Sequence, residues 1–237
     1  MYRIICAYAK KSSATYVHPI EKIVLAILPI IVLGFFNNIT LILVNISIFL
    51  LVHIFSKNPA KLAFKFALGI ALFAAISCIT FVFDYGITYS LAIILKSFSG
   101  GLCLAYLALT TPLDDILYYA SKIDALKDVC DIAKSMERFL VLIEDEYLLL
   151  HRAVKSRGGL DSLPLKIKNT GKIAGLLFVN TLKRWDEIKD AISSRCYKGY
   201  MSYMIKDFNF SKIRFIVILG YNIMLLGLNY VIGHLKI

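Results

Sequence analysis

The sequence predicts an all-α, polytopic membrane protein of about five transmembrane helices, with a cytoplasmic block of long amphipathic helices between spans four and five. The first observation is composition, because 59% of the residues are hydrophobic and the mean hydropathy is +0.72. Soluble domains contain roughly 45–50% apolar residues, so the excess indicates lipid as a solvent. The second observation is charge: residues 112–212 hold 17 of the 27 Lys and Arg residues and 14 of the 16 Asp and Glu residues.

Residues 1–111 are predicted to form a membrane domain of four spans, at about 20–36, 39–55, 62–83 and 87–109. The first span follows Pro19, which suits a first helical turn, and Pro29 inside it predicts a kink that a helix bundle tolerates. Its apolar run, "IVLAILPIIVLGFF", is short for about 30 Å of hydrocarbon. Residues 20–22 must therefore contribute to the span.

The later spans are bounded by polar segments. The second span ends at "SKNPAK", and the third ends at "DYG". The fourth contains Lys96 near its middle, which we interpret as a packing or interfacial residue because a charge at this depth needs a partner. Gly100, Gly101 and Gly220 are expected to permit close helix packing. Residues 213–237 form a predicted fifth span and the C-terminus.

The basic residues predict the orientation of the chain, because cytoplasmic loops of membrane proteins are enriched in Lys and Arg. The turns between spans one and two and between spans three and four carry neither. The N-terminus and residues 112–212 are therefore predicted to be cytoplasmic. The basic residues that lie outside the spans on this side are Arg3, Lys10, Lys11, Lys57 and Lys61, with Lys65 at the start of span three.

Residues 112–212 are predicted to form three helices, at about 112–128, 131–157 and 166–195. The first starts with Thr111 before Pro112 and has acidic residues in its first turn, as capped helices do. Apolar residues at helical spacing predict amphipathic faces on the other two. The segment "GGLDSLP" separates them.

The two longer helices finish with the same pattern, an Ala three residues ahead of a Ser-Arg pair. It reads Ala153-x-x-Ser156-Arg157-Gly158 in one and Ala191-x-x-Ser194-Arg195-Cys196 in the other. Ala and Arg four residues apart share a helix face, so a partner can approach the small residue closely while the guanidinium reaches its carboxylates or carbonyls. Alternatively, both Arg side chains are solvated and complement the helix dipoles.

These features resemble the transmembrane (T) subunit of energy-coupling factor (ECF) transporters, the CbiQ/EcfT family, and most of all its cobalt-uptake branch. The resemblance covers nearly the whole chain and includes "HPIEKI" at 18–23, "TTPLDDIL" at 110–117 and the two Ala-Arg-Gly-type helix ends. Ser replaces Ala in both ends. Cys196 replaces Gly in the second end, where a positive φ would be costlier.

The resemblance implies a non-catalytic coupling subunit with cytoplasmic coupling helices and multi-pass insertion in the plasma membrane. In that family the T subunit joins a membrane-embedded substrate-binding subunit to two ATP-binding-cassette ATPases, and its Arg ends sit in grooves on these ATPases. ATP and Mg would be used by the partners, with no cofactor or metal bound by this chain. The branch implies cobalt as substrate, linked to cobalamin biosynthesis, while a nickel or vitamin system remains an alternative.

Other functions have less support in the sequence. A membrane enzyme acting on lipids would need a nucleophile-base pair or a paired-Asp metal motif, and neither is apparent. A channel or secondary carrier would usually need polar residues along several spans. The dispersed Cys and His residues suggest neither a disulfide framework nor a zinc site. Nucleic-acid binding is disfavoured because the chain lacks such a motif, and no phosphate-loop sequence is present.

Overall fold

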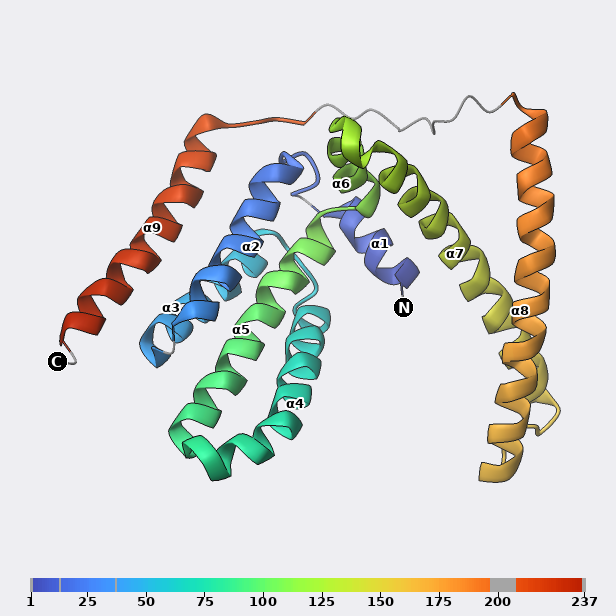
Figure 1. The fold of residues 1–237 in the computed structure, drawn as a ribbon, viewed down its shortest axis with the longest axis horizontal. Coiled ribbons are helices and arrows are strands. Elements are labelled where there is room, and N and C mark those ends of the chain that lie inside the picture. The colour runs from blue at the N-terminus through green and yellow to red at the C-terminus, as the bar shows by residue number, and fades with distance from the viewer. Residues whose placement is uncertain (1, 13, 37, 197–207, 236–237) are drawn as a thin grey trace. The chain divides into compact units, whose positions relative to one another are not determined.

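A computed structural model describes residues 2–12, 14–36, 38–196 and 208–235 of the chain. The described residues form helices, and they contain no strand beyond an isolated bridge between Val17 and Asn209. The all-α prediction is therefore confirmed. The chain divides into two compact units, Met1–Ile116 with Ile205–Ile237 and Leu117–Met204. Each unit is described by itself below, and Figure 1 shows the helices that belong to each.

The first unit contains the apolar helices. They are α2 (Pro19–Phe35), α3 (Ile39–Phe55), α4 (Ala60–Tyr85), α5 (Ile87–Thr110) and α9 (Lys212–Leu235), preceded by α1 (Tyr2–Lys11). Among the described residues, α4, α5 and α9 are long and apolar enough to cross a membrane. Helices α2 and α3 have 17 residues each, about 26 Å at 1.5 Å per residue. The polytopic class is thus supported, while the count of five spans stays a prediction.

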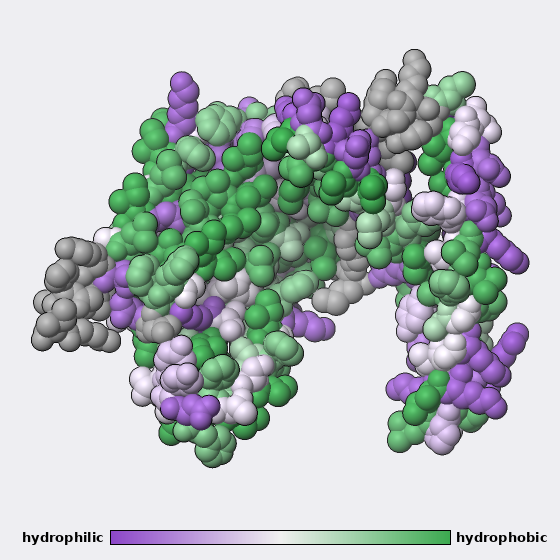
Figure 2. Space-filling view, viewed as in Figure 1, coloured by the Kyte–Doolittle hydropathy of each residue, from purple (hydrophilic) through white to green (hydrophobic). Residues whose placement is uncertain are grey.

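Apolar side chains cover the outside of this unit. Figure 2 shows hydrophobic residues over most of the visible surface of α2. On α4, Phe73 and Phe83 are 73% and 86% exposed. Burying a Phe side chain is favourable by roughly 1.5–3 kcal/mol, so such exposure in water would be costly. A surface of this kind suits contact with lipid.

Helix α4 packs closely against α5 through small side chains. The buried residues of α4 recur at helical spacing and are Ala63, Ala67, Ala71, Ala74 and Cys78. A Cβ added at Gly101 of α5 would lie 2.8 Å from the Cα of Ala67. The expected close approach is therefore confirmed at Gly101. It is wrong at Gly100 and Gly220, where an added Cβ would meet no atom of a described residue within 4 Å.

Polar side chains connect the helices inside this unit. Lys96 Nζ donates to the carbonyl of Gly34, 3.1 Å away, near the C-terminal end of α2, which agrees with the predicted packing role. Asn45 Nδ2 donates to Ser99 Oγ over 2.6 Å, and the Asn45 amide oxygen accepts from the Tyr221 hydroxyl. These contacts join α3, α5 and α9. Such hydrogen bonds give polar side chains a partner where no water is present, as is usual between membrane helices.

The charged block begins with shorter helices than predicted. The helix expected over residues 112–128 is instead α6 (Leu113–Ala120), followed by a turn and the one-turn helix η1 (Asp124–Leu126). Ser121 Oγ donates to the carbonyl of Tyr118 over 2.9 Å. Serine hydroxyls that bond nearby carbonyls in this way compete with helix continuation. The chain passes into the second unit within α6.

The second unit consists mainly of two long helices, α7 (Lys127–Ser156) and α8 (Leu163–Ser194). Each begins three or four residues earlier than the sequence predicts, and α8 starts with Pro164 in its first turn. The two helices are antiparallel. Phe139 stacks on Trp185 with ring centroids 6.0 Å apart, and Asn180 Nδ2 donates to Glu146 Oε1 over 2.6 Å.

Candidate coupling site

Arg157 is the C-cap of α7, with φ −94° and ψ 12°. The next residue, Gly158, takes φ +69°. The N–H of Gly158 donates to the carbonyl of Lys155 over 3.1 Å, and the N–H of Gly159 donates to that of Val154 over 3.0 Å. This pair of bonds is the Schellman arrangement, which satisfies the free carbonyls of a helix end and stops the helix.

Arg195 ends α8 with nearly the same geometry, φ −91° and ψ 19°. Cys196 then takes φ +54°, so it adopts the left-handed conformation that Gly158 adopts at the other end. The N–H of Cys196 donates to the carbonyl of Ser193 over 3.1 Å. This is the counterpart of the Gly158 bond. The two ends are therefore matched in backbone form, despite the Gly-to-Cys difference.

The serines of the two motifs bond to their own helices. Ser156 Oγ donates to the carbonyl of Ala153 over 3.0 Å. Ser194 Oγ donates to the carbonyl of Asp190 over 2.8 Å. Ala153 and Ala191 are exposed, so each motif presents a small side chain one turn before its Arg. Each serine hydroxyl thus donates its hydrogen to a carbonyl of its own helix.

Arg157 and Arg195, called the arginine ends below, are both exposed. Within the described ranges, neither guanidinium makes a hydrogen bond or ion pair to another described residue. Each can present five N–H donors in a planar fork, which matches carboxylate or carbonyl oxygens of a partner. The arrangement is therefore suited to binding such oxygens.

The arginine ends lie far apart. Arg157 precedes the first residue of α8 by six residues, and Arg195 directly follows the last. Helix α8 has 32 residues, which corresponds to about 48 Å at 1.5 Å per residue. Two exposed guanidinium groups at this separation are far enough apart to reach two different protein surfaces.

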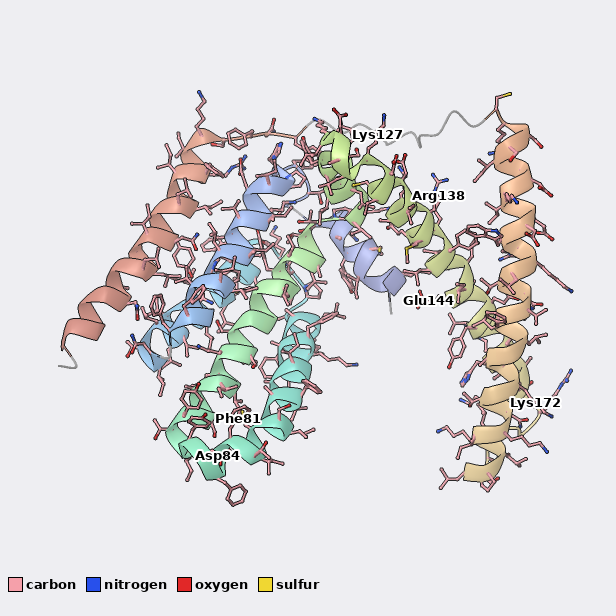
Figure 3. The ribbon with its side chains drawn as sticks, viewed as in Figure 1. Phe81, Asp84, Lys127, Arg138, Glu144 and Lys172 are labelled. Carbon is pink, nitrogen blue, oxygen red and sulfur yellow. The ribbon has the colours of Figure 1, made fainter. Side chains whose placement is uncertain are left out.

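A groove of about 740 Å³ lies between the first half of α7 and the last half of α8. Its lining is mostly apolar and includes Phe139, Leu142 and Trp185, with Asp128 and Arg195 among the polar residues. Figure 3 labels Arg138, another residue of the lining. Sequence reasoning missed this groove because it exists only once the antiparallel register of α7 and α8 is known.

Among the described side chains, no group of three or more His, Cys, Asp or Glu residues is arranged to hold a metal ion. The motif "HPIEKI" lies instead at the start of α2 in the first unit. His18 is its N-cap, and His18 Nδ1 accepts from the N–H of Ile20 over 3.3 Å. The His18 ring lies edge-on to Phe210, with centroids 5.5 Å apart.

Comparison with known proteins gives one family and two curated relatives. Residues 10–204 match the model of a family described as CbiQ, cobalt transport protein. A protein of Methanocorpusculum labreanum named as a fused cobalt transport protein, CbiMQ, is 27% identical over 112 residues, 47% of this chain. An uncharacterized protein of Methanocaldococcus jannaschii is 25% identical over 118 residues, 50% of this chain. The matched segments span 19% and 44% of these relatives' own lengths.

Proposed function

Because the chain belongs to the CbiQ cobalt transport protein family, we propose that it is the transmembrane coupling (T) subunit of an ATP-driven ECF-type uptake transporter. It is a multi-pass membrane protein of a transport family. In the proposed assembly it links a membrane-embedded substrate-binding subunit to two cytoplasmic ATP-binding-cassette ATPases. The ATPases supply the chemistry with ATP and Mg, while this chain binds no cofactor and catalyses no reaction.

The observation that carries this proposal is the matched pair of arginine ends. Both have the same cap geometry, both are exposed, and the length of α8 separates them. Each Arg is proposed to enter a groove on one ATPase, where its fork binds carboxylate or carbonyl oxygens. When ATP brings the two ATPases together and hydrolysis lets them part, the arginine ends are carried with them. The resulting displacement of α7 and α8 is passed on to the substrate-binding subunit.

The proposed setting is the plasma membrane, with the N-terminus and residues 112–212 in the cytoplasm. Lys and Arg are concentrated before the first predicted span and between the second and third, and this distribution supports the orientation. It places both arginine ends on the side where ATP is available. The substrate proposed is the cobalt ion, supported by the family description and by the name of the fused relative. Uptake of ⁵⁷Co²⁺, ⁶³Ni²⁺ and labelled vitamins by cells expressing the complete system would separate cobalt from the nickel and vitamin alternatives.

The central test replaces both arginine ends, as Arg157→Glu with Arg195→Glu. We expect the ATPases to be lost from the chain during affinity purification in mild detergent, because the carboxylates would repel the acceptor groups. Membrane insertion should be unchanged. The matched control is Arg152→Glu with Arg184→Glu, which changes the same charge at exposed positions of the same two helices. A double variant at the arginine ends that retains the ATPases and normal uptake would refute the proposal.

A further inference from the structure

Two adjacent charged residues, Glu21 and Lys22, lie buried in the first turn of α2. Each is only 1% exposed. A buried charge is costly unless it is paired and hydrogen-bonded. The partners of these two side chains therefore show which parts of the fold they connect. All of those named below belong to the first unit.

Glu21 holds the beginning of α9. Its Oε1 accepts from the N–H of Ser211 over 2.9 Å, and its Oε2 lies 3.3 Å from Nε of Arg214. No described donor has hydrogen-bond geometry to that second oxygen, so the charge of Arg214 is what offsets its burial. Arg214 Nη2 also donates to the carbonyl of Asn209 over 2.6 Å. These contacts fix the first turn of α9 against α2.

Lys22 holds the end of α5. Its Nζ donates to the carbonyl of Thr110 over 2.9 Å, in a buried contact. Thr110 is the last residue of α5, where carbonyls lack a partner within the helix. A cation is also favoured there by the helix dipole. The lysine therefore fixes the C-terminal turn of α5 against α2.

These contacts lie close in sequence to the two places where the chain connects the units. The chain leaves the first unit after Ile116 and returns to it at Ile205. Thr110 lies six residues before Ile116, and Ser211 lies six residues after Ile205. The parts of the first unit that lead into both connections are thus bonded to two consecutive residues of α2.

We propose that Glu21 and Lys22 form an anchor through which movement of the second unit is transmitted to the membrane helices. The inference rests on the proposed coupling function. Glu21 and Lys22 are positioning residues that touch neither ATP nor substrate. Without the anchor, the ends of α5 and α9 can shift separately, and displacement of α7 and α8 is absorbed before it reaches α2. ATP hydrolysis would then continue with little transport.

The structural part of the anchor is tested by hydrogen exchange on the full chain in detergent. The variants are Glu21→Ala and Arg214→Ala; the control is Lys212→Gln, an exposed neighbour in the same turn of α9. We expect amides of the segment 208–216 to exchange at least about tenfold faster in both variants. Glu21→Ala removes the carboxylate that accepts from the Ser211 N–H. Arg214→Ala removes the donor to the Asn209 carbonyl and the charge beside Glu21. The control should match the wild type. Unchanged exchange in both variants would overturn the anchor.

The functional part is tested on the complete transporter in proteoliposomes, with ⁵⁷Co²⁺ as the probe. In Glu21→Gln and Lys22→Met we expect the ATPases to co-purify and hydrolyse ATP at near the wild-type rate. Uptake per ATP should fall at least about tenfold. Arg214→Ala changes a partially exposed side chain and provides a second variant if the buried substitutions prevent folding. Faster exchange combined with normal uptake per ATP would refute transmission through the anchor.

The two proposals can fail separately. If the wild-type chain retains no ATPase, the coupling function fails, while hydrogen exchange still tests the anchor on the chain alone. If the arginine ends are needed for ATPase binding but the anchor variants transport normally, only the anchor fails.

Discussion

Cys196 has a positive φ, a conformation that costs an L-residue roughly 1–2 kcal/mol. The corresponding residue of the other arginine end is Gly158, for which the same conformation carries no Cβ penalty. The two arginine ends therefore differ in conformational strain, although their backbone conformations match. The end of α7 is relaxed, whereas the end of α8 stores a small strain.

Replacing Cys196 with Gly is predicted to stabilise the end of α8 by up to about 1 kcal/mol, because relief of strain exceeds the added flexibility of the unfolded chain. Thermal unfolding followed by circular dichroism would measure the gain. Cys196→Ala is the matched control, since alanine keeps the Cβ and the strained φ. Equal gains for Gly and Ala would show that the thiol, rather than the backbone conformation, is unfavourable.

At the scale of elements, the α4–α5 pair depends on one close backbone approach. Gly101 allows it because an added Cβ would lie 2.8 Å from the Cα of Ala67, a backbone atom that cannot rotate away. Its neighbour Gly100 lies on the same helix with open space around it. Substitutions at these two glycines can therefore distinguish the effect of packing from the effect of helix propensity.

Gly101→Ala is predicted to destabilise the first unit by about 1–3 kcal/mol, the usual cost of overpacking. Gly100→Ala should be neutral or stabilising by up to about 1 kcal/mol, because alanine is the better helix former. Thermal unfolding of both variants in the same detergent provides the comparison. Equal stabilities for the two variants would mean that α4 and α5 do not pack as the structure describes.

At the scale of the whole molecule, the two arginine ends give the chain two attachment points in the proposed complex. Linked attachments raise the effective concentration of the second binding event, which can strengthen binding by about 10²–10⁴-fold. Loss of either end should therefore weaken the assembly strongly, without removing every contact.

We predict that Arg157→Glu alone and Arg195→Glu alone each leave an ATPase-containing complex that dissociates faster than the wild type, while the double variant retains none. Surface-immobilised chain with purified ATPases would give the dissociation rates. If one single variant behaves as the wild type and the other as the double variant, only one arginine end binds an ATPase.

The sequence was sufficient for features set by local chemistry. Helix type, the Pro-bounded start of α2 and the shared pattern of the arginine ends follow from residue order and spacing. Features set by distant contacts were not predictable. The Lys22–Thr110 and Glu21–Ser211 contacts join residues 88 and 190 positions apart, and Lys96 bonds to a backbone carbonyl that has no sequence signature. Helix α1 was not expected, because its ten residues carry no strong boundary signal.

Helices α2 and α3 are about 26 Å long at 1.5 Å per residue, shorter than the roughly 30 Å of a typical hydrocarbon layer. As spans of the predicted membrane domain, they would draw the two leaflets together beside them, at a cost of fractions of a kcal/mol per Å of mismatch. A neighbouring protein that also prefers a thin bilayer would share this deformation. Lipid acyl-chain length would therefore influence which membrane proteins collect next to this one.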